Sequence, residues 1–174
     1  MDSLRLNIDY DDRTKTLYLY GSSITIHCHH YISNLLKMID SSPYVDGGSI
    51  MYDAAEKVTI KHIGRVFEKN NITATDEKYA AAEEFFGKLG FGRLKFDIIN
   101  GEVKGASSSV GFIPKSWTLK YGERPDHICY FTAGYIAGVI EVINNAPQSS
   151  YEVSETACIA SGSPECVFVV RSPI

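Results

Sequence analysis

The sequence lacks several features that would assign it to a class at once. No apolar run approaches the roughly 20 residues that a membrane-spanning helix needs, and Asp2, Arg5, Asp9 and Asp11 stand where a signal peptide would be apolar. Basic residues are not in excess, since 17 Lys and Arg against 21 Asp and Glu give a net charge of -4, and no run of lysine and arginine could follow a phosphate backbone. We therefore expect a cytoplasmic protein without a membrane span and without direct nucleic-acid binding.

Cysteine and recognisable catalytic signatures are also sparse. The four cysteines, in a reducing compartment, are more plausible as metal ligands or buried apolar groups than as disulfide partners. No nucleophile stands beside a base in a recognisable local motif, and Gly90-Phe91-Gly92-Arg93 lacks the full glycine pattern of a phosphate-binding loop. The sequence therefore favours binding over turnover.

What is present is the composition and pattern of one globular domain that spans residues 1–174. Hydrophobic residues make up 44% and charged residues 22% of the chain, and neither a repeat nor a linker is visible. The hydrophobic pattern and the turn signals predict strands at 4–10, 16–20, 92–99, 102–109, 151–157 and 167–171, and helices through 32–39, 50–67, 76–89 and 126–144. This order predicts an α+β fold, in which an antiparallel sheet carries its helices on one face.

A group of candidate metal ligands lies near the C-terminal end. Glu155, Cys158 and Cys166 stand in one short segment, and Cys129 precedes them by one predicted helix. Thiolates and a carboxylate suit zinc, and four protein ligands leave no open position for water, so such a site would be structural. Residues three apart on a strand point to opposite faces, so Glu155 and Cys158 share an ion only if the strand ends between them. Buried apolar thiols are the alternative, and spacing alone leaves both open.

A second group comprises the run His27-Cys28-His29-His30-Tyr31 and the single tryptophan, Trp117. A metal or haem site is one interpretation of the run, but adjacent histidines cannot all face one ion. We expect instead that one or two of these side chains, His30 and Tyr31, contact a ligand. Trp117 follows a polar stretch and needs an apolar surface, which a ligand pocket, a dimer contact or the core could supply.

The C-terminal half resembles a known family. The resemblance covers residues 90–170 and rests on Gly90-Phe91-Gly92, Ser116-Trp117, Cys129, the run Gly134-Tyr135-Ile136-Ala137-Gly138, and then Glu155, Cys158, Gly162 and Cys166. These motifs are similar to those of the 4-vinyl reductase or hydrocarbon-binding domain family. Its members include the sensory domains of phenol-responsive bacterial activators, and its fold is shared with a vesicle-tethering subunit that holds a fatty-acyl chain.

The resemblance implies a site as well as a fold. It implies zinc ligands at Cys129, Glu155, Cys158 and Cys166, and a role for Trp117 in contacting a bound aromatic molecule. The segment before Glu155 is a few residues longer than in the phenol sensors, which bears on Cys129 as the fourth ligand. The sequence contains no ATPase or DNA-binding domain after this region, so any signal is expected to pass to a separate partner.

The function expected from the sequence is that of a sensor or carrier domain, which binds a small hydrophobic or aromatic ligand, contains a structural zinc and forms a homodimer. An alternative is an enzyme or accessory factor that acts on a tetrapyrrole or similar cofactor, with the residues from His27 to Tyr31 gripping it. A further alternative is a scaffold that pairs two copies through an apolar surface.

Overall fold

The computed structural model describes residues 4–172 and contains two antiparallel sheets and five α-helices in that part of the chain. In chain order the elements are β1 (Ile8–Asp11), β2 (Thr16–Leu19), β3 (Ser22–Ile24), α1 (His29–Asp40), α2 (Gly47–Lys69), α3 (Thr75–Lys88), β4 (Arg93–Ile99), β5 (Glu102–Ser109), α4 (Phe112–Tyr121), α5 (Tyr130–Asn144), β6 (Glu152–Ala157), the 3-10 helix η1 (Ile159–Ser161) and β7 (Cys166–Arg171). The α+β class that the sequence predicts is confirmed.

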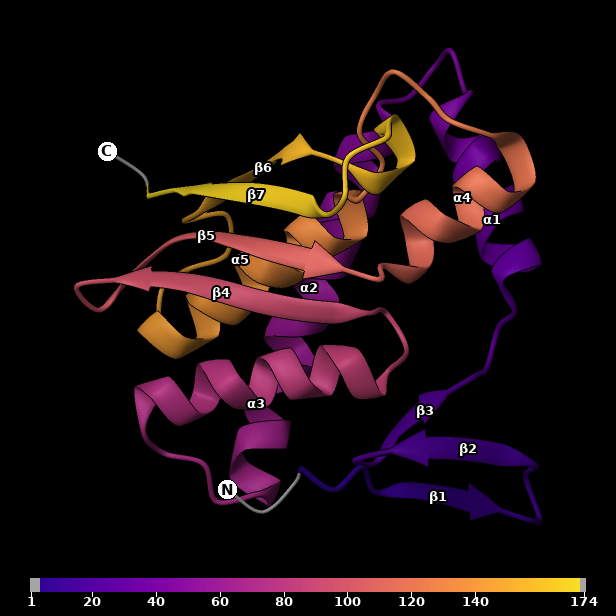
Figure 1. The fold of residues 1–174 in the computed structure, drawn as a ribbon. Coiled ribbons are helices and arrows are strands. Elements are labelled where there is room, and N and C mark those ends of the chain that lie inside the picture. Colours follow the sequence, from indigo (N-terminus) through magenta and orange to yellow (C-terminus); the bar gives the residue numbers. More distant parts are fainter. Residues whose placement is uncertain (1–3, 173–174) are drawn as a thin grey trace.

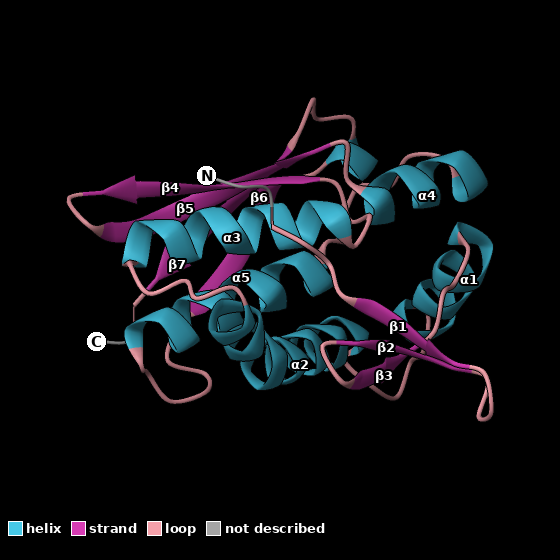
Figure 2. Ribbon diagram, turned by 90° about the horizontal axis from the view of Figure 1, so that it is seen from below, coloured by secondary structure: helices cyan, strands magenta, loops and turns pink. Residues whose placement is uncertain are grey.

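The larger sheet has the strand order β4-β5-β7-β6, and every neighbouring pair is antiparallel. The turn at Asn100-Gly101 joins β4 to β5 with positive φ at both residues, as a two-residue hairpin requires. Figure 2 shows α3 and α5 lying along one face of this sheet, with α2 on the far side of α5. The small sheet β1-β2-β3 lies apart from the large one, at the lower right of Figure 1.

Helix α5 forms the centre of the core, because it is covered by the sheet on one side and by α2 on the other. Two glycines of this helix allow it to approach α2 closely. A Cβ atom on Gly138 would lie 2.8 Å from the Cβ of Thr59, and one on Gly134 would meet the carbonyl oxygen of Tyr52. The two helices can therefore pack this closely only because glycine stands at both positions.

Two elements are absent from the sequence-based prediction. Strand β3 follows β2 through a tight turn at Tyr20-Gly21, where both φ angles are positive, so residues that the sequence suggests as a loop belong to the sheet. Helix α4 contains Pro114 in its first turn, where a proline costs no hydrogen bond. No helix in residues 4–172 combines the length and hydrophobicity that crossing a bilayer would require.

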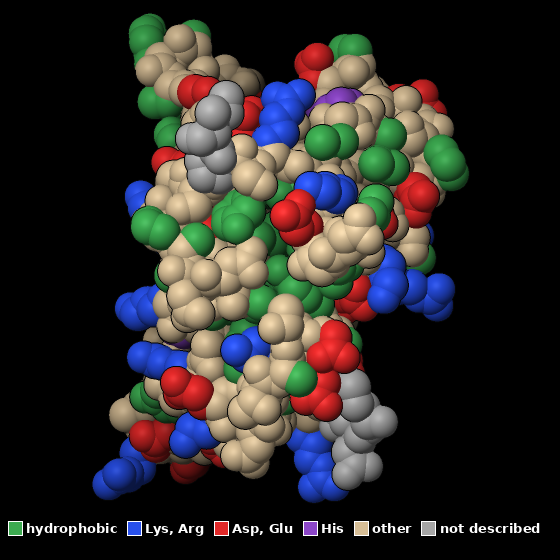
Figure 3. All heavy atoms as spheres, turned by 90° about the vertical axis from the view of Figure 1, so that its left-hand side faces the viewer, with side chains coloured by type: hydrophobic (Ala, Val, Ile, Leu, Met, Phe, Trp, Pro, Cys, Tyr) green, Lys and Arg blue, Asp and Glu red, His purple; other side chains and the backbone are tan. Residues whose placement is uncertain are grey.

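On the face drawn in Figure 3, lysine and arginine side chains are interspersed with aspartate and glutamate side chains. This mixed distribution accords with the net charge of -4. Beneath the surface, the buried hydrophobic residues form one core cluster that includes the three cysteines of the C-terminal half, Cys129, Cys158 and Cys166.

Candidate metal centre and ligand cavities

The structure brings Cys129, Glu155, Cys158 and Cys166 together at the end of the large sheet. One ligand atom from each residue can be chosen so that all four lie within 4.8 Å of one another. The Sγ atom of Cys129 lies 3.9 Å from that of Cys158 and 3.4 Å from that of Cys166, and the remaining pair is 4.0 Å apart. Sulfur ligands about 2.3 Å from a tetrahedral zinc lie roughly 3.8 Å from each other. The spacing therefore fits a shared metal ion and is much too long for a disulfide.

A local irregularity in β6 allows Glu155 and Cys158 to face the same side, although residues three apart on a regular strand face opposite sides. The pairing of β6 with β7 shifts between Glu155 and Ala157, and the strand ends there. The chain then turns through η1, where Gly162 has a φ of +89° and the amide of Ser163 donates to the carbonyl oxygen of Cys158 at 3.0 Å. The bulge and the turn together place Glu155 and Cys158 on the same side.

Cys129 and Cys166 approach this point from two other elements. Cys129 is the N-cap residue of α5, and its backbone amide donates to Glu155 Oε2 at 3.0 Å. Cys166 opens β7, and its sulfur accepts from the backbone amide of Ile159 at 3.4 Å. All three thiols are buried, with 0 to 2% of each residue exposed. The start of α5 thus meets, at one set of donors, the segment from Glu155 to Cys166, which begins 26 residues after Cys129.

The electrostatics of the group show an unmet need for positive charge. Burial, and then the neighbouring Cys158, raises the pKa of Glu155 to about 7. Hydrogen bonds to Cys158 and Cys166, and then burial, raise the pKa of Cys129, while hydrogen bonds from Cys129 and Cys166 lower the pKa of Cys158. The second oxygen of Glu155, Oε1, is buried without a hydrogen-bond partner. Apolar packing of the thiols does not explain why an unpartnered carboxylate oxygen is buried beside them. A bound cation would compensate the negative charge of all four groups. The four residues therefore fit a metal ion.

An apolar cavity of about 290 Å³ lies between β2–β3, α2, α3 and α5. Its wall is aromatic and aliphatic, with a polar group at one place. Phe85, Phe91 and Phe131 line it with aromatic rings, and Ser22, His62 and Arg65 line it with polar groups. The hydroxyl of Tyr135 already donates to the carbonyl oxygen of Ala82 at 2.8 Å, so this ring presents its apolar surface.

A second cavity of about 580 Å³ adjoins the first, since Leu19, Ile24, Leu89 and Phe91 line both. It extends towards the small sheet and the start of α1, and His27 is one of its lining residues. Both volumes are of the size that small-molecule sites usually have. The segment that ends α3, with Leu89 and Phe91, therefore separates two apolar spaces.

The residues that the sequence suggests for a ligand pocket lie elsewhere. Trp117 is 8% exposed and packs in α4 against Tyr121, with the Arg124 guanidinium 4.7 Å from its ring. Tyr31 is 52% exposed and stacks on His27, with ring centroids 4.4 Å apart. His30 is exposed on the first turn of α1, beside the ring of His29. None of Trp117, His30 and Tyr31 lines either cavity.

Sequence reasoning missed the aromatic residues that do line the first cavity. Phe131 and Tyr135 stand four residues apart on α5, so they share one face of that helix. Phe91 stacks on Phe131, with ring centroids 4.5 Å apart. The signal available in the sequence was the position of Phe91 between two glycines, but only the tertiary structure brings it to α5.

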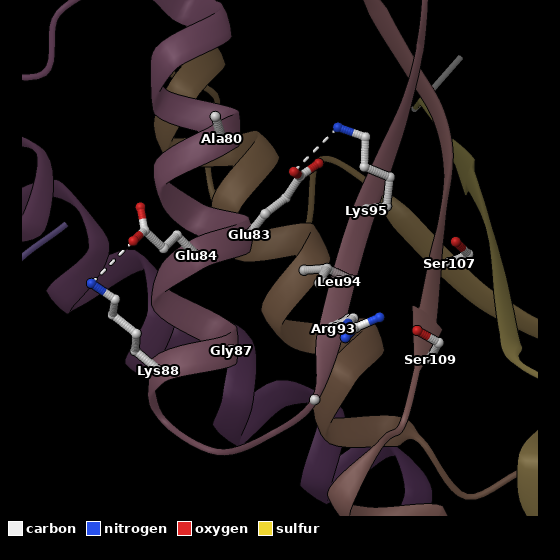
Figure 4. Close-up of a pocket in the computed structure, with 11 residues that line it drawn as sticks. Ala80, Glu83, Glu84, Gly87, Lys88, Arg93, Leu94, Lys95, Ser107 and Ser109 are labelled. Carbon is white, nitrogen blue, oxygen red and sulfur yellow. Dashed lines mark hydrogen bonds and ion pairs between the residues drawn. The ribbon is translucent and has the colours of Figure 1, made fainter. Parts of the chain in front are cut away.

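A third concavity of about 630 Å³ lies between α3 and the strands β4 and β5 (Figure 4). Charged side chains from both elements line it and pair with one another. Glu83 accepts from Lys95 Nζ at 3.3 Å and from the backbone amide of Phe96 at 2.8 Å, and Lys88 lies 3.0 Å from Glu84. Its polar wall distinguishes it from the two apolar cavities.

Comparison with solved structures shows which known proteins share this fold. The phenol-responsive sensory domain of the transcription activator PoxR, with phenol, superimposes with a TM-score of 0.78 at 11% identity, over 95% of this chain and 84% of that one. The chain shares the fold of that sensory domain. The fold relationship that the sequence motifs suggest is therefore confirmed.

Two further structures have the same fold with lower scores. A vinyl-4-reductase family protein from Methanocaldococcus jannaschii gives a TM-score of 0.51 at 17% identity, over 88% of this chain and 100% of that one. A trafficking protein particle complex subunit 3 from Naegleria fowleri, covalently bound to palmitic acid, gives 0.52 at 14% identity, over 83% and 92%.

Sequence comparison gives a shorter match. An uncharacterized protein of Methanocaldococcus jannaschii, MJ0855, is 47% identical over 47 residues, which are 27% of this chain and 20% of that protein. The chain thus matches about a fifth of that relative's length. No protein-family profile matches the sequence.

Proposed function

We propose that this chain binds a small hydrophobic or aromatic molecule, as a sensor or carrier, in the cavity between β2–β3, α2, α3 and α5. The single observation that carries the proposal is an apolar, aromatic-lined cavity in a fold shared with a phenol-responsive sensory domain. Such cavities are typically apolar with a few placed polar groups. Binding, rather than turnover, is the proposed activity.

A cavity-filling variant tests this proposal. Val58 lines the cavity but is 57% exposed on α2, so Val58→Trp should block the space without disturbing the core. Val45→Trp is the matched control, because Val45 is 48% exposed and lines neither cavity. Calorimetry with 2-phenylethanol should give binding to the wild type and to Val45→Trp, and at least tenfold weaker binding to Val58→Trp. Equal affinities in all three proteins would refute the cavity as the site.

We further propose that Cys129, Glu155, Cys158 and Cys166 hold a zinc ion. The support is the donor set, three sulfurs and one carboxylate at metal-compatible spacing, since thiolates favour zinc and four protein ligands close the site. A bound zinc would supply positive charge and a crosslink between β6, β7 and the start of α5. Its role would therefore be structural.

Elemental analysis and unfolding measurements test the zinc proposal together. We expect one zinc per chain in the wild type, and loss of the metal with several kcal/mol of stability in Cys158→Ser, because metal-binding energy is folding energy. Cys28→Ser is the control, since Cys28 is exposed and lies outside the group. Metal-free wild type with the same melting temperature as Cys158→Ser would refute the proposal.

We also propose that two copies pair through α1. Tyr31, Leu35 and Met38 recur at helical spacing on this helix and are 52%, 40% and 72% exposed, so they form an apolar stripe that faces away from the core. A second copy would cover it. Sedimentation should give a dimer for the wild type and a monomer for Met38→Glu, while Lys57→Glu, an exposed change on α2, should stay dimeric. A monomeric wild type would contradict this.

The alternative function, action on a tetrapyrrole, has one observation in its favour, which is that His27 lines the 580 Å³ cavity. A single imidazole in an apolar space could act as an axial ligand. Visible absorbance of the purified protein tests this alternative. A colourless protein that does not develop absorbance when haem is added would exclude it.

A further inference from the structure

The cavity proposed as the ligand site has one polar end, formed by Ser22 of β3 and by His62 and Arg65 of α2. Ser22 Oγ lies 3.1 Å from His62 Nδ1, and Arg65 Nη1 donates to Ser22 Oγ at 3.2 Å. His62 and Arg65 are three residues apart on α2 and therefore point to the same side of the helix. The three side chains form a connected polar group at the edge of an otherwise apolar wall.

This polar group is positive in character. No Asp or Glu is among the residues that line the cavity, and within residues 4–172 no carboxylate forms an ion pair with Arg65. Burial, and then the nearby cations Arg65 and Lys61, lowers the pKa of His62. The imidazole therefore stays neutral near pH 7 and offers one N–H, while the guanidinium keeps its charge.

The donors at this end outnumber the acceptors. Arg65 uses one N–H on Ser22, so its remaining N–H groups are available to a ligand. If the Ser22 hydroxyl donates to His62 Nδ1, the imidazole is protonated on Nε2 and becomes a second donor. A carboxylate is acceptor-only and can take two hydrogen bonds from an arginine. An amine would add donors beside an existing cation, and an alcohol would leave the charge uncompensated.

We infer, on the basis of the proposed cavity function, that the ligand is a small hydrophobic carboxylic acid, whose carboxylate meets Arg65 and His62 while its apolar part lies among Phe85, Phe91 and Phe131. The volume of about 290 Å³ sets the size of the apolar part to that of one aromatic ring or a short alkyl chain. Arg65 is exposed, so solvent weakens its attraction for the carboxylate. Its charge therefore distinguishes an acid from an uncharged or cationic analogue, while the apolar wall supplies most of the affinity.

Three probes of nearly equal shape test the inference: phenylacetate, 2-phenylethanol and 2-phenylethylamine. Calorimetry on the metal-loaded wild type at pH 7.5 should show phenylacetate binding about tenfold more tightly than 2-phenylethanol, and the amine more weakly than either. Added salt should weaken phenylacetate alone. If none of the three binds, the proposed function fails and this inference with it. If the alcohol binds as tightly as the acid, only the inference fails.

Variants on α2 test whether Arg65 is responsible for the preference for the acid. Arg65→Gln should reduce the preference for phenylacetate over 2-phenylethanol to about twofold or less, while Arg65→Lys should retain most of the preference. Lys61→Gln is the matched control. It also removes a positive charge, one helical turn from Arg65, but Lys61 does not line the cavity. Phenylacetate selectivity that survives in Arg65→Gln, or disappears equally in Lys61→Gln, would overturn the assignment.

Discussion

A pair of buried carboxyl groups between α2 and α5 makes the stability of this protein depend on pH. Glu56 and Glu141 are 0% and 1% exposed, and each has one oxygen, Glu56 Oε1 and Glu141 Oε2, without a hydrogen-bond partner. The other oxygens accept from the loop before β6, Glu56 from Gln148 Nε2 and Glu141 from the amide of Ser150, both at 2.8 Å. Burial first, and then the charge of Glu56, raises the pKa of Glu141 from 4.5 to about 7.

The sign of the effect follows from proton binding. Between pH 4.5 and 7 the unfolded chain ionises at Glu141 while the folded protein keeps the proton, so the folded state binds more protons and the free energy of unfolding falls as pH rises. Below pH 4.5 the contribution of Glu141 to the free energy of unfolding is fully retained, and above pH 7 it is completely lost. Because one pKa unit corresponds to about 1.4 kcal/mol, a rise from 4.5 to about 7 makes the loss at pH 8 about 3 to 3.5 kcal/mol.

Replacing Glu141 with glutamine tests this reasoning. The amide cannot ionise, and its oxygen can still accept from the Ser150 amide, so Glu141→Gln should be more stable than the wild type by about 3 kcal/mol at pH 8 and by less than about 1 kcal/mol at pH 5. Urea denaturation from pH 5 to 8 measures it. Titration at any other group, including Glu155, cancels in the difference between the two proteins, because both contain that group.

The control for this test is Glu68→Gln, an exposed change on α2, which should follow the wild-type profile at every pH. A difference between wild type and Glu141→Gln that stays constant from pH 5 to 8 would refute the reasoning, because it would mean that the substitution alters packing and not proton binding.

Three further predictions concern the packing and the metal centre. Gly138→Ala should destabilise by about 1 to 3 kcal/mol in urea denaturation, because the new Cβ would lie 2.8 Å from Thr59 and only 2.9 Å from a backbone oxygen, whereas Gly64→Ala, whose Cβ would have 4.0 Å of room, should be neutral or stabilising. Trp117→Ala should cost about 3 to 5 kcal/mol of unfolding free energy but leave the affinity for 2-phenylethanol unchanged, because the ring lies in the core and outside both cavities. A chelator should lower the melting temperature of the wild type and not that of Cys166→Ser, and an equal decrease in both would contradict a metal at this residue.

Local signals were sufficient for much of the fold. The predicted helix through 50–67 lies within α2, which Asp46 caps by accepting from the amide of Ser49 at 3.1 Å, a contact between neighbours in the chain. The Asn100-Gly101 turn and the alternation in β4 likewise depend only on neighbouring residues. Helix α4 was not predicted because of Pro114. A proline disrupts the interior of a helix but is tolerated in its first turn, and the sequence alone does not show where this helix begins.

The candidate metal residues can be suggested from the sequence, whereas the cavity cannot. Cys158 and Cys166 are close in the chain, so their spacing and their chemistry are enough to suggest a shared site. The cavity is built from residues on five elements, and nothing local indicates that Phe91 should stack on Phe131, or that His62 should meet Ser22, 40 residues away. Trp117 was ambiguous because a lone tryptophan suits a pocket and a core equally well, and here it packs beneath Arg124.

Arg124 connects the candidate metal centre to the N-terminal half of the chain. Its backbone amide donates to the carbonyl oxygen of Ala160 in η1 at 2.9 Å, and its guanidinium donates to both oxygens of Asp40, at 3.0 and 3.3 Å, at the end of α1. The same guanidinium covers the Trp117 ring. Since one residue contacts η1, α4 and α1, an ion that fixes the position of η1 would also fix the end of α1. A closed metal site at the edge of the sheet can therefore stabilise the helix that carries the proposed dimer surface.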